Sequence, residues 1–100
     1  MAKFNLVVAH ELRQGEAIRR VRAEIESLKK QYGNRIANLR ESWDCDTYAF
    51  QATAMGVTAS GTMAVKPSHV EIDADLPWYA MLLKNRVGAA IQERLRNLLS

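Results

Sequence analysis

Apolar and polar residues alternate in the middle of the chain. From Val57 to Val65, every second residue is apolar or small, and the residues between them include three with hydroxyl groups. A period of two is typical of an antiparallel strand with one buried and one exposed face. Turn residues such as Gly56 and Pro67 interrupt the alternation, which therefore predicts four successive strands. They cover residues 36–43, 47–55, 57–66 and 70–76.

Residues 2–9 predict a further strand, and a helical pattern follows it from about Arg13 to Tyr32. In this segment apolar residues recur every three or four positions, which places them along one narrow side of a helix. They are Ile18, Val21, Ile25, Leu28 and Tyr32. Gly33 and Asn34 are expected to end the helix, because glycine tolerates the left-handed conformation that closes many helices.

A second helix is predicted from Pro77 to the end of the chain, with Asp75 as a candidate cap for its free amide groups. Its apolar residues cluster on one side, which we expect to pack on the sheet. They are Ala80, Leu83, Val87, Ile91, Leu95 and Leu98. Trp78 and Leu82 fall on roughly the opposite side, so we expect them to be exposed if only the first side packs.

The order of these elements, β-α-β-β-β-β-α, predicts an α+β fold. A chain of 100 residues supports one core. We therefore expect a single domain, residues 1–100, in which two helices cover one face of a five-stranded antiparallel sheet. Small residues dominate the layer between helices and sheet, and they predict close packing without a large lipid cavity. They are Ala52, Ala54, Ala59, Gly61, Ala74, Gly88 and Ala90.

Composition narrows the setting in which the protein works. The net charge of +3 comes from 14 basic and 11 acidic residues that are interleaved, whereas nucleic-acid binders concentrate a stronger basic excess on one face. We therefore predict no nucleic-acid partner. The single Cys45 cannot form an internal disulfide, which favours a reducing cytoplasm. No segment resembles a signal peptide or reaches the roughly 20 apolar residues of a membrane span, so the predicted location is cytoplasmic.

The candidate catalytic residues do not form a recognisable constellation. Cys45 lies between Asp44 and Asp46, whose negative charges disfavour a thiolate nucleophile. His10 and His69 have no second ligand at a metal-binding spacing. We expect His10 to bond the backbone at the turn after the first strand, and His69 to lie on a solvated strand. The sequence therefore predicts no enzyme activity, no metal and no cofactor.

Charged residues offer two weaker alternatives. The first helix mixes both signs, and Glu16 and Arg20 have the i,i+4 spacing of an ion pair on a solvated helix. Its basic residues could instead dock on an acidic partner. Glu71, Asp73 and Asp75 repeat on the predicted outer face of the sheet, where they could hold a cation. Alternating charges on a solvated sheet explain them more simply.

Six consecutive apolar residues at 78–83, Trp-Tyr-Ala-Met-Leu-Leu, form the most distinctive segment. Six consecutive apolar residues occupy all sides of a helix, whereas one core covers only one side, so part of the run should face outward. One interpretation is a second core contact, for instance with the first helix. The other is a docking surface of Trp78, Met81 and Leu82 for a second copy of the chain, another protein or an apolar surface.

Residues spread over nearly the whole chain also match a family pattern. They are His10-x-Leu12 after a strand, the helix 17–32, Trp43 before Asp44, Gly61–Val65, Val70-x-Ile72, Leu76-Pro77 and the final helix 84–98. In these positions the chain resembles the putative polyhydroxyalkanoic acid system proteins, which bacteria encode near polyhydroxyalkanoate granule genes. The resemblance implies a cytoplasmic bacterial protein linked to storage granules, and it supplies no catalytic residues.

The leading hypothesis is therefore a non-enzymatic accessory or interaction protein of the polyhydroxyalkanoate system. It would use Trp78, Met81 and Leu82 to dock on a granule surface or a granule protein, and a homodimer through the same residues is the related alternative. A second hypothesis is a small hydrophobic-ligand binding protein of helix-grip type, with a hydroxyacyl or lipid-like ligand. That hypothesis predicts an enclosed apolar cavity between helices and sheet.

Overall fold

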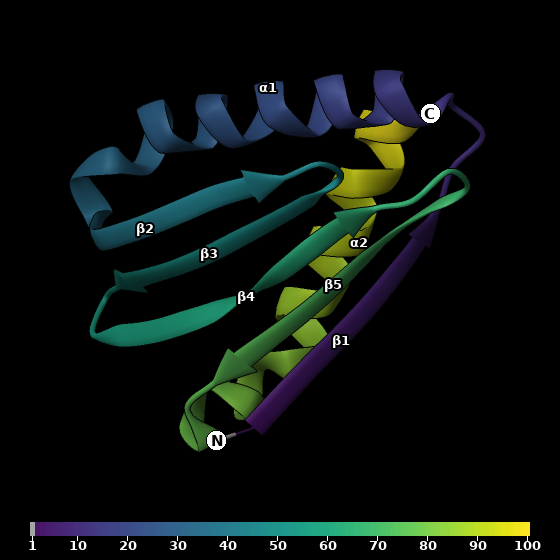
Figure 1. Cartoon of the computed structure of the whole chain (residues 1–100). Helices are drawn as coiled ribbons and strands as arrows, with labels where there is room; N and C mark the ends of the chain where they lie inside the picture. The colour runs from purple at the N-terminus through teal and green to yellow at the C-terminus, as the bar shows by residue number, and fades with distance from the viewer. Residues whose placement is uncertain (1) are drawn as a thin grey trace.

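The computed structural model describes residues 2–100 and has the predicted element order (Figure 1). The α+β fold with a five-stranded antiparallel sheet and two helices is confirmed. The elements are β1 (Ala2–Ala9), α1 (Gln14–Tyr32), the 3₁₀ turn η1 (Gly33–Arg35), β2 (Ile36–Asp44), β3 (Thr47–Ala54), β4 (Val57–Val65), β5 (His69–Leu76), the 3₁₀ helix η2 (Trp78–Leu83) and α2 (Lys84–Leu99).

The strand order in the sheet is β1-β5-β4-β3-β2. Strands β2 to β5 follow one another as hairpins, and α1 carries the chain from β1 at one edge to β2 at the other. The register aligns apolar residues across the sheet, since Met63 pairs with both Tyr48 and Ile72. Val8 likewise pairs with Val70. Because side chains alternate between faces, this register collects the apolar set on the side that the helices cover.

The core lies where β1 ends, α1 begins and α2 ends, at the upper right of Figure 1. We call this part of the molecule the closed end. Burying each of the larger apolar side chains in this core contributes roughly 1.5–3 kcal/mol to the stability of the fold. The buried cluster consists of Val8, Ala17, Val21, Val65, Val70, Ile72, Leu95 and Leu99.

The two helices meet at the closed end and diverge from it. Figure 1 shows α1 running along β2 while α2 runs behind β5 and β1. At the meeting point, Nη1 of Arg20 donates hydrogen bonds to the carbonyl oxygens of Leu98 (3.1 Å) and Ser100 (3.0 Å). These bonds satisfy carbonyl groups at the end of α2 that have no partner within the helix. The diverging helices leave part of the sheet face between them less covered.

The C-terminal segment differs from the prediction in three respects. It starts as the 3₁₀ helix η2, which is common at helix starts, and no side chain caps either helix, so the predicted cap by Asp75 is wrong. Leu83 and Val87 were expected to pack on the sheet but are 54% and 42% exposed. The reason is that α2 packs closely only along β1 and the closed end.

The first helix also ends differently from the prediction, because Gly33 is right-handed (φ −55°) and continues into η1.

The small residues have more varied roles than predicted. At Gly88 a Cβ atom would lie 3.3 Å from Cε2 of Phe4, so α2 does approach β1 closely there. At Gly61 a Cβ atom would lie only 2.2 Å from the carbonyl oxygen of Asp73, which is the backbone of the neighbouring strand. This glycine therefore permits a close approach between strands. Ala54 and Ala90 are exposed, so close packing at these two positions was wrongly predicted.

Candidate functional site

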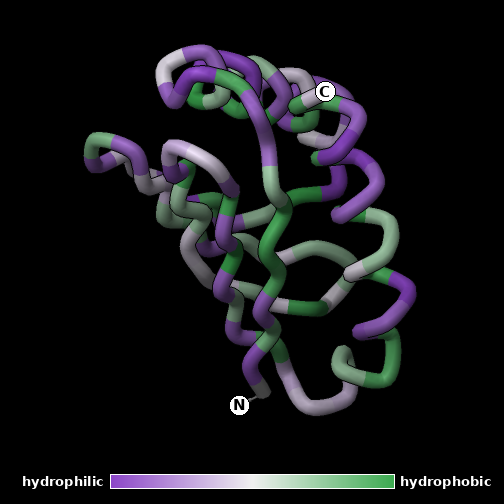
Figure 2. Tube along the Cα trace, turned by 90° about the vertical axis from the view of Figure 1, so that its right-hand side faces the viewer, coloured by the Kyte–Doolittle hydropathy of each residue, from purple (hydrophilic) through white to green (hydrophobic). Residues whose placement is uncertain are grey.

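The most exposed large apolar side chains of η2 and α2 gather where η2 passes into α2. Trp78 is 75% exposed and Leu82 is 81% exposed, as their position on the helical wheel predicts. Met81 is half-buried and contributes less to this surface than expected. Figure 2 shows η2 as a hydrophobic stretch on the outer side of the molecule at the lower right. We call the exposed set the η2 surface: Trp78, Tyr79, Leu82, Leu83 and Val87.

Basic residues accompany the η2 surface. Between positions 78 and 88 the chain contains Lys84 and Arg86 and no acidic residue, and both basic side chains are exposed. The rings of Trp78 and Tyr79 pack edge to face, with centroids 5.8 Å apart. Apolar and aromatic side chains next to basic ones are typical of segments that lie on an interface between water and an apolar phase.

An apolar cavity of about 250 Å³ lies between the two helices and the sheet. We call it the helix–sheet cavity. Several of its lining residues are only half-buried, among them Ile25, Phe50 and Ile91, so it reaches the solvent. The lining residues are Val21, Glu24, Ile25, Leu28, Phe50, Met63, Ile72, Ile91, Arg94, Leu95 and Leu98.

Two charged residues, Glu24 of α1 and Arg94 of α2, stand at this otherwise apolar cavity. Nη2 and Nε of Arg94 donate hydrogen bonds to the same oxygen, Oε1 of Glu24, at 2.7 and 3.1 Å. The Arg94 side chain is 52% exposed. This ion pair therefore connects the diverging helices at the border between cavity and solvent.

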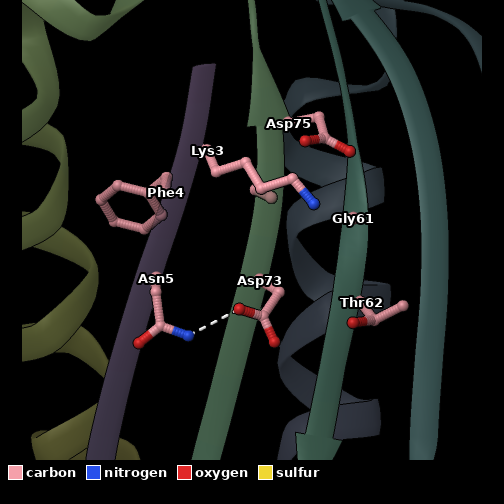
Figure 3. Close-up of a pocket in the computed structure, with 8 residues that line it drawn as sticks. Lys3, Phe4, Asn5, Gly61, Thr62, Asp73 and Asp75 are labelled. Atoms are coloured by element: carbon pink, nitrogen blue, oxygen red, sulfur yellow. Dashed lines mark hydrogen bonds between the residues drawn. The ribbon is translucent and has the colours of Figure 1, made fainter. Parts of the chain in front are cut away.

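A polar depression of about 560 Å³ lies at the sheet around β1, β4 and β5 (Figure 3). Figure 3 shows Phe4 pointing toward α2, whereas Lys3, Asn5 and Asp73 point away from that helix. Nδ2 of Asn5 donates a 2.6 Å hydrogen bond to Asp73 Oδ1. Within residues 2–100, no three His, Cys, Asp or Glu side chains are grouped so that they could hold a metal ion. A solvated polar sheet face accounts for this depression.

The residues considered for catalysis lie in positions that fit a structural role. His10 is buried, its Nε2 is 2.9 Å from the carbonyl oxygen of Lys66, and its Nδ1 accepts a hydrogen bond from the Leu12 amide at 3.1 Å. The predicted backbone bonding of His10 is thus confirmed. His69 lies on β5, with Nε2 3.6 Å from Glu71. Cys45 is exposed in the turn between β2 and β3.

Many of the charged side chains of α1 form ion pairs. Glu16 binds both Arg19 (2.6 Å) and Arg20 (2.9 Å). Hydrogen bonds from these two guanidinium groups lower the pKa of Glu16 from 4.5 to about 2. The predicted i,i+4 pair is therefore present, and Glu26 pairs with Lys29 at 2.9 Å.

One charged network on the helix-facing side of the sheet was missed. Glu41 of β2 binds Lys29 of α1 and accepts a 2.5 Å hydrogen bond from the Tyr48 hydroxyl. Hydrogen bonds from Lys29 and Tyr48 lower the pKa of Glu41, while burial and the nearby Glu41 raise the pKa of Tyr48. Arg22 stacks over the Trp43 ring at 4.5 Å beside this network. The alternation of Glu41 with Trp43 was the signal that could have placed this carboxylate facing α1.

Comparison with known protein families adds a biological context to this geometry. The family described as "putative polyhydroxyalkanoic acid system protein" matches residues 5–99. The chain belongs to this family. Its description names a storage-polymer system and no reaction, and the comparison with curated proteins gives no match.

The family assignment agrees with the resemblance inferred from the sequence. Among solved structures, the crystal structure of TTHA0849 from Thermus thermophilus is 15% identical, with 98% of this chain and 92% of that chain covered. Its TM-score is 0.37, a likeness too distant to carry any argument about this family member. None of the helices described in residues 2–100 is long and apolar enough to cross a membrane.

Proposed function

We propose that this protein is a non-enzymatic accessory protein that attaches to the apolar surface of polyhydroxyalkanoate granules through its η2 surface. The observation that carries the proposal is the exposure of Trp78 and Leu82 beside Tyr79 and Leu83 on one short segment. The family description supplies the polymer system. The proposal also places the protein in the cytoplasm, without a nucleic-acid partner.

The energetics of the η2 surface support attachment to an extended apolar phase. Fully burying one large apolar side chain contributes roughly 1.5–3 kcal/mol, so Trp78 and Leu82 together offer several kcal/mol. The neighbouring Lys84 and Arg86 can stay in water at the border of such a phase. A polymer surface with no fixed shape fits this arrangement, because the side chains of the η2 surface are exposed and η2 lies at the outer side of the molecule (Figure 2).

A granule-pelleting assay tests the proposal. Purified protein is mixed with granules washed free of their own proteins, and the bound fraction is measured after centrifugation. We expect the unmodified protein to pellet with the granules and the double variant Trp78→Asp, Leu82→Asp to stay in the supernatant. Aspartate places a charge in an apolar contact, which makes burial costly.

The matched control is the double variant Met55→Asp, Leu39→Asp. It introduces the same charge at two exposed apolar residues outside the η2 surface. We expect this control to pellet like the unmodified protein. Equal pelleting of the η2 double variant would contradict the proposal. Pelleting that requires unwashed granules would point to a granule protein as partner, and a dimer that the η2 variant dissociates would point to a second copy.

A second candidate function is the binding of a small apolar ligand, and the helix–sheet cavity favours it. The cavity lies between the helices and the sheet, but it reaches the solvent and is not the enclosed cavity of the original hypothesis. Ligand binding and granule attachment use different surfaces, so either function can operate without the other. Stabilisation against heat by 3-hydroxyacyl compounds would support ligand binding, because a ligand that binds only the folded state raises the melting temperature.

A further inference from the structure

The positive charge of the protein is concentrated in its C-terminal segment. Residues 78–100 contain four basic residues and one acidic residue, whereas residues 1–77 contain ten of each. The whole net charge of +3 therefore lies on η2 and α2. This is the segment that also carries the η2 surface, so its apolar side chains and the excess of positive charge occur together.

Lys84 and Arg86 bring free positive charge to the η2 surface. Both side chains are exposed, and among residues 2–100 neither forms an ion pair. Arg94, by contrast, is paired with a carboxylate of α1. Residues three positions apart on a helix are neighbours, so Arg86 lies beside Leu83 and Lys84 lies beside Val87. The two charges thus border the apolar side chains directly.

The acidic residues of the preceding strand lie on the other side of the sheet. Strand β5, which leads into η2, carries Glu71, Asp73 and Asp75. Figure 3 shows Asp73 pointing away from α2, and residues two positions apart on a strand share a face. An anionic surface is therefore attracted by the helix side of the molecule and repelled by this part of the outer sheet face. The charge distribution favours one orientation, with η2 toward the anionic surface.

We infer that the η2 surface attaches to an apolar phase coated with anionic lipid, with Trp78 and Leu82 among the acyl chains and Lys84 and Arg86 on the lipid phosphates. This inference rests on the proposed function, attachment through the η2 surface, and names the chemistry of the surface that is recognised. Apolar burial and attraction to anionic lipids add to each other at such an interface. A bare neutral polymer would use only the apolar side chains.

The test is co-sedimentation with lipid vesicles of two compositions. One contains only phosphatidylcholine, and in the other about a third of the lipid is anionic phosphatidylglycerol. We expect roughly thirtyfold stronger partitioning to the anionic vesicles, because each of two basic residues near such a surface contributes about fivefold. The preference should shrink at high salt, which screens the attraction.

Substitution of basic residues locates this preference. The double variant Lys84→Gln, Arg86→Gln should lose most of the preference for anionic vesicles and bind neutral vesicles as before. The control Lys30→Gln, Arg96→Gln changes the net charge by the same amount at two exposed positions outside the η2 surface. Arg96 lies ten residues beyond Arg86, about 15 Å along the helix, which exceeds the screening length of roughly 8 Å. The control should therefore keep most of the preference.

Substitution of the apolar residues tests their insertion. Trp78→Ala, Leu82→Ala leaves the charge unchanged and should reduce binding to both kinds of vesicle, because it removes the side chains that enter the apolar phase. The chain has two tryptophans, so in a Trp43→Phe background Trp78 is the only one. Its fluorescence should move to shorter wavelengths on anionic vesicles. Unchanged emission from bound protein would overturn the inference.

The outcomes separate this inference from the function on which it rests. If both vesicle compositions bind equally, or if the Lys84, Arg86 variant and its control behave alike, the anionic coat is overturned while granule pelleting through Trp78 and Leu82 still stands. If neither vesicles nor granules bind, the inference and the proposed function both fail. The substituted side chains of η2 and α2 are exposed, so these variants should fold, and circular dichroism verifies this.

Discussion

The two ends of the helix layer are built from the same kinds of residues but differ in burial. At the closed end, Val21 of α1 and Leu99 of α2 are at most 3% exposed. At the other end, Leu82 and Trp78 are more than 70% exposed. We call this second part, from η2 to the β3–β4 turn, the open end. Apolar character alone therefore does not decide which residues form the core and which form a surface.

The difference arises from the angle between the helices. Arg20, near the start of α1, forms hydrogen bonds with the end of α2, and Lys29, in the other half of α1, forms an ion pair with Glu41 of β2. Both helices are thus held on the sheet, but they diverge (Figure 1). The helix–sheet cavity lies between them, and the η2 surface lies beyond it. Closed and open ends are consequences of one packing geometry.

The difference in burial between the two ends is tested most strongly by truncating one leucine at each end, and the leucine at the closed end is Leu95. Leu95→Ala should lower the free energy of unfolding by about 2–4 kcal/mol, because it removes buried contacts and leaves a cavity. Urea denaturation monitored by circular dichroism measures this change. A loss below about 1 kcal/mol would show that the closed end is not packed as described.

The β3–β4 turn at the open end tests whether a local strain is tolerated there. Met55 has φ 54° and Gly56 has φ 79°, the two positive angles of a type I′ turn. Methionine in the left-handed region costs about 1 kcal/mol, and its side chain is 92% exposed. Met55→Asn should therefore stabilise the protein by up to about 1 kcal/mol. A loss of stability on thermal unfolding would mean that Met55 makes contacts that its exposure does not indicate.

The Glu41 network predicts how acid affects the attachment of α1 to the sheet. The pKa of Glu41 is lowered in the folded state, so its contribution to stability is present above the unfolded pKa and is lost as the pH falls through the folded pKa. Glu41→Gln should cost about 0.5–1 kcal/mol at pH 7. The variant should also lose less stability than the unmodified protein between about pH 5 and pH 2. If the free energy of unfolding, measured by urea denaturation, changed with pH in the same way for the variant and the unmodified protein, this role of Glu41 would be contradicted.

Leu82→Ala is the counterpart of the Leu95 substitution and should have the smallest effect on stability. Truncation of an exposed side chain usually changes the free energy of unfolding by less than about 0.5 kcal/mol. The same substitution should measurably lower the granule-bound fraction if the η2 surface mediates attachment. A large loss of stability would instead identify Leu82 as a packing residue.

Residue patterns predicted the strands and their faces well, because period-two alternation reports directly on burial. The alternation from Val57 to Val65 predicted a strand with one buried face, and β4 spans these residues, with Val65 fully buried. The exposure of Trp78 and Leu82 was likewise predicted, because a helical wheel cannot place them beside Leu95. The partner of this surface stays a prediction, since exposure does not name what covers it.

Other features depended on contacts between segments that are distant in the chain. Arg94 of α2 pairs with Glu24 of α1, 70 residues away, and no local pattern indicates that they would meet at a cavity. Leu83 and Val87 fit the core-facing pattern but are exposed, because α2 leaves the sheet uncovered there. The sequence by itself determined the elements and their apolar faces, which follow from local periodicity. Tertiary packing decided the divergence of the helices, and with it which apolar residues became core, cavity or surface.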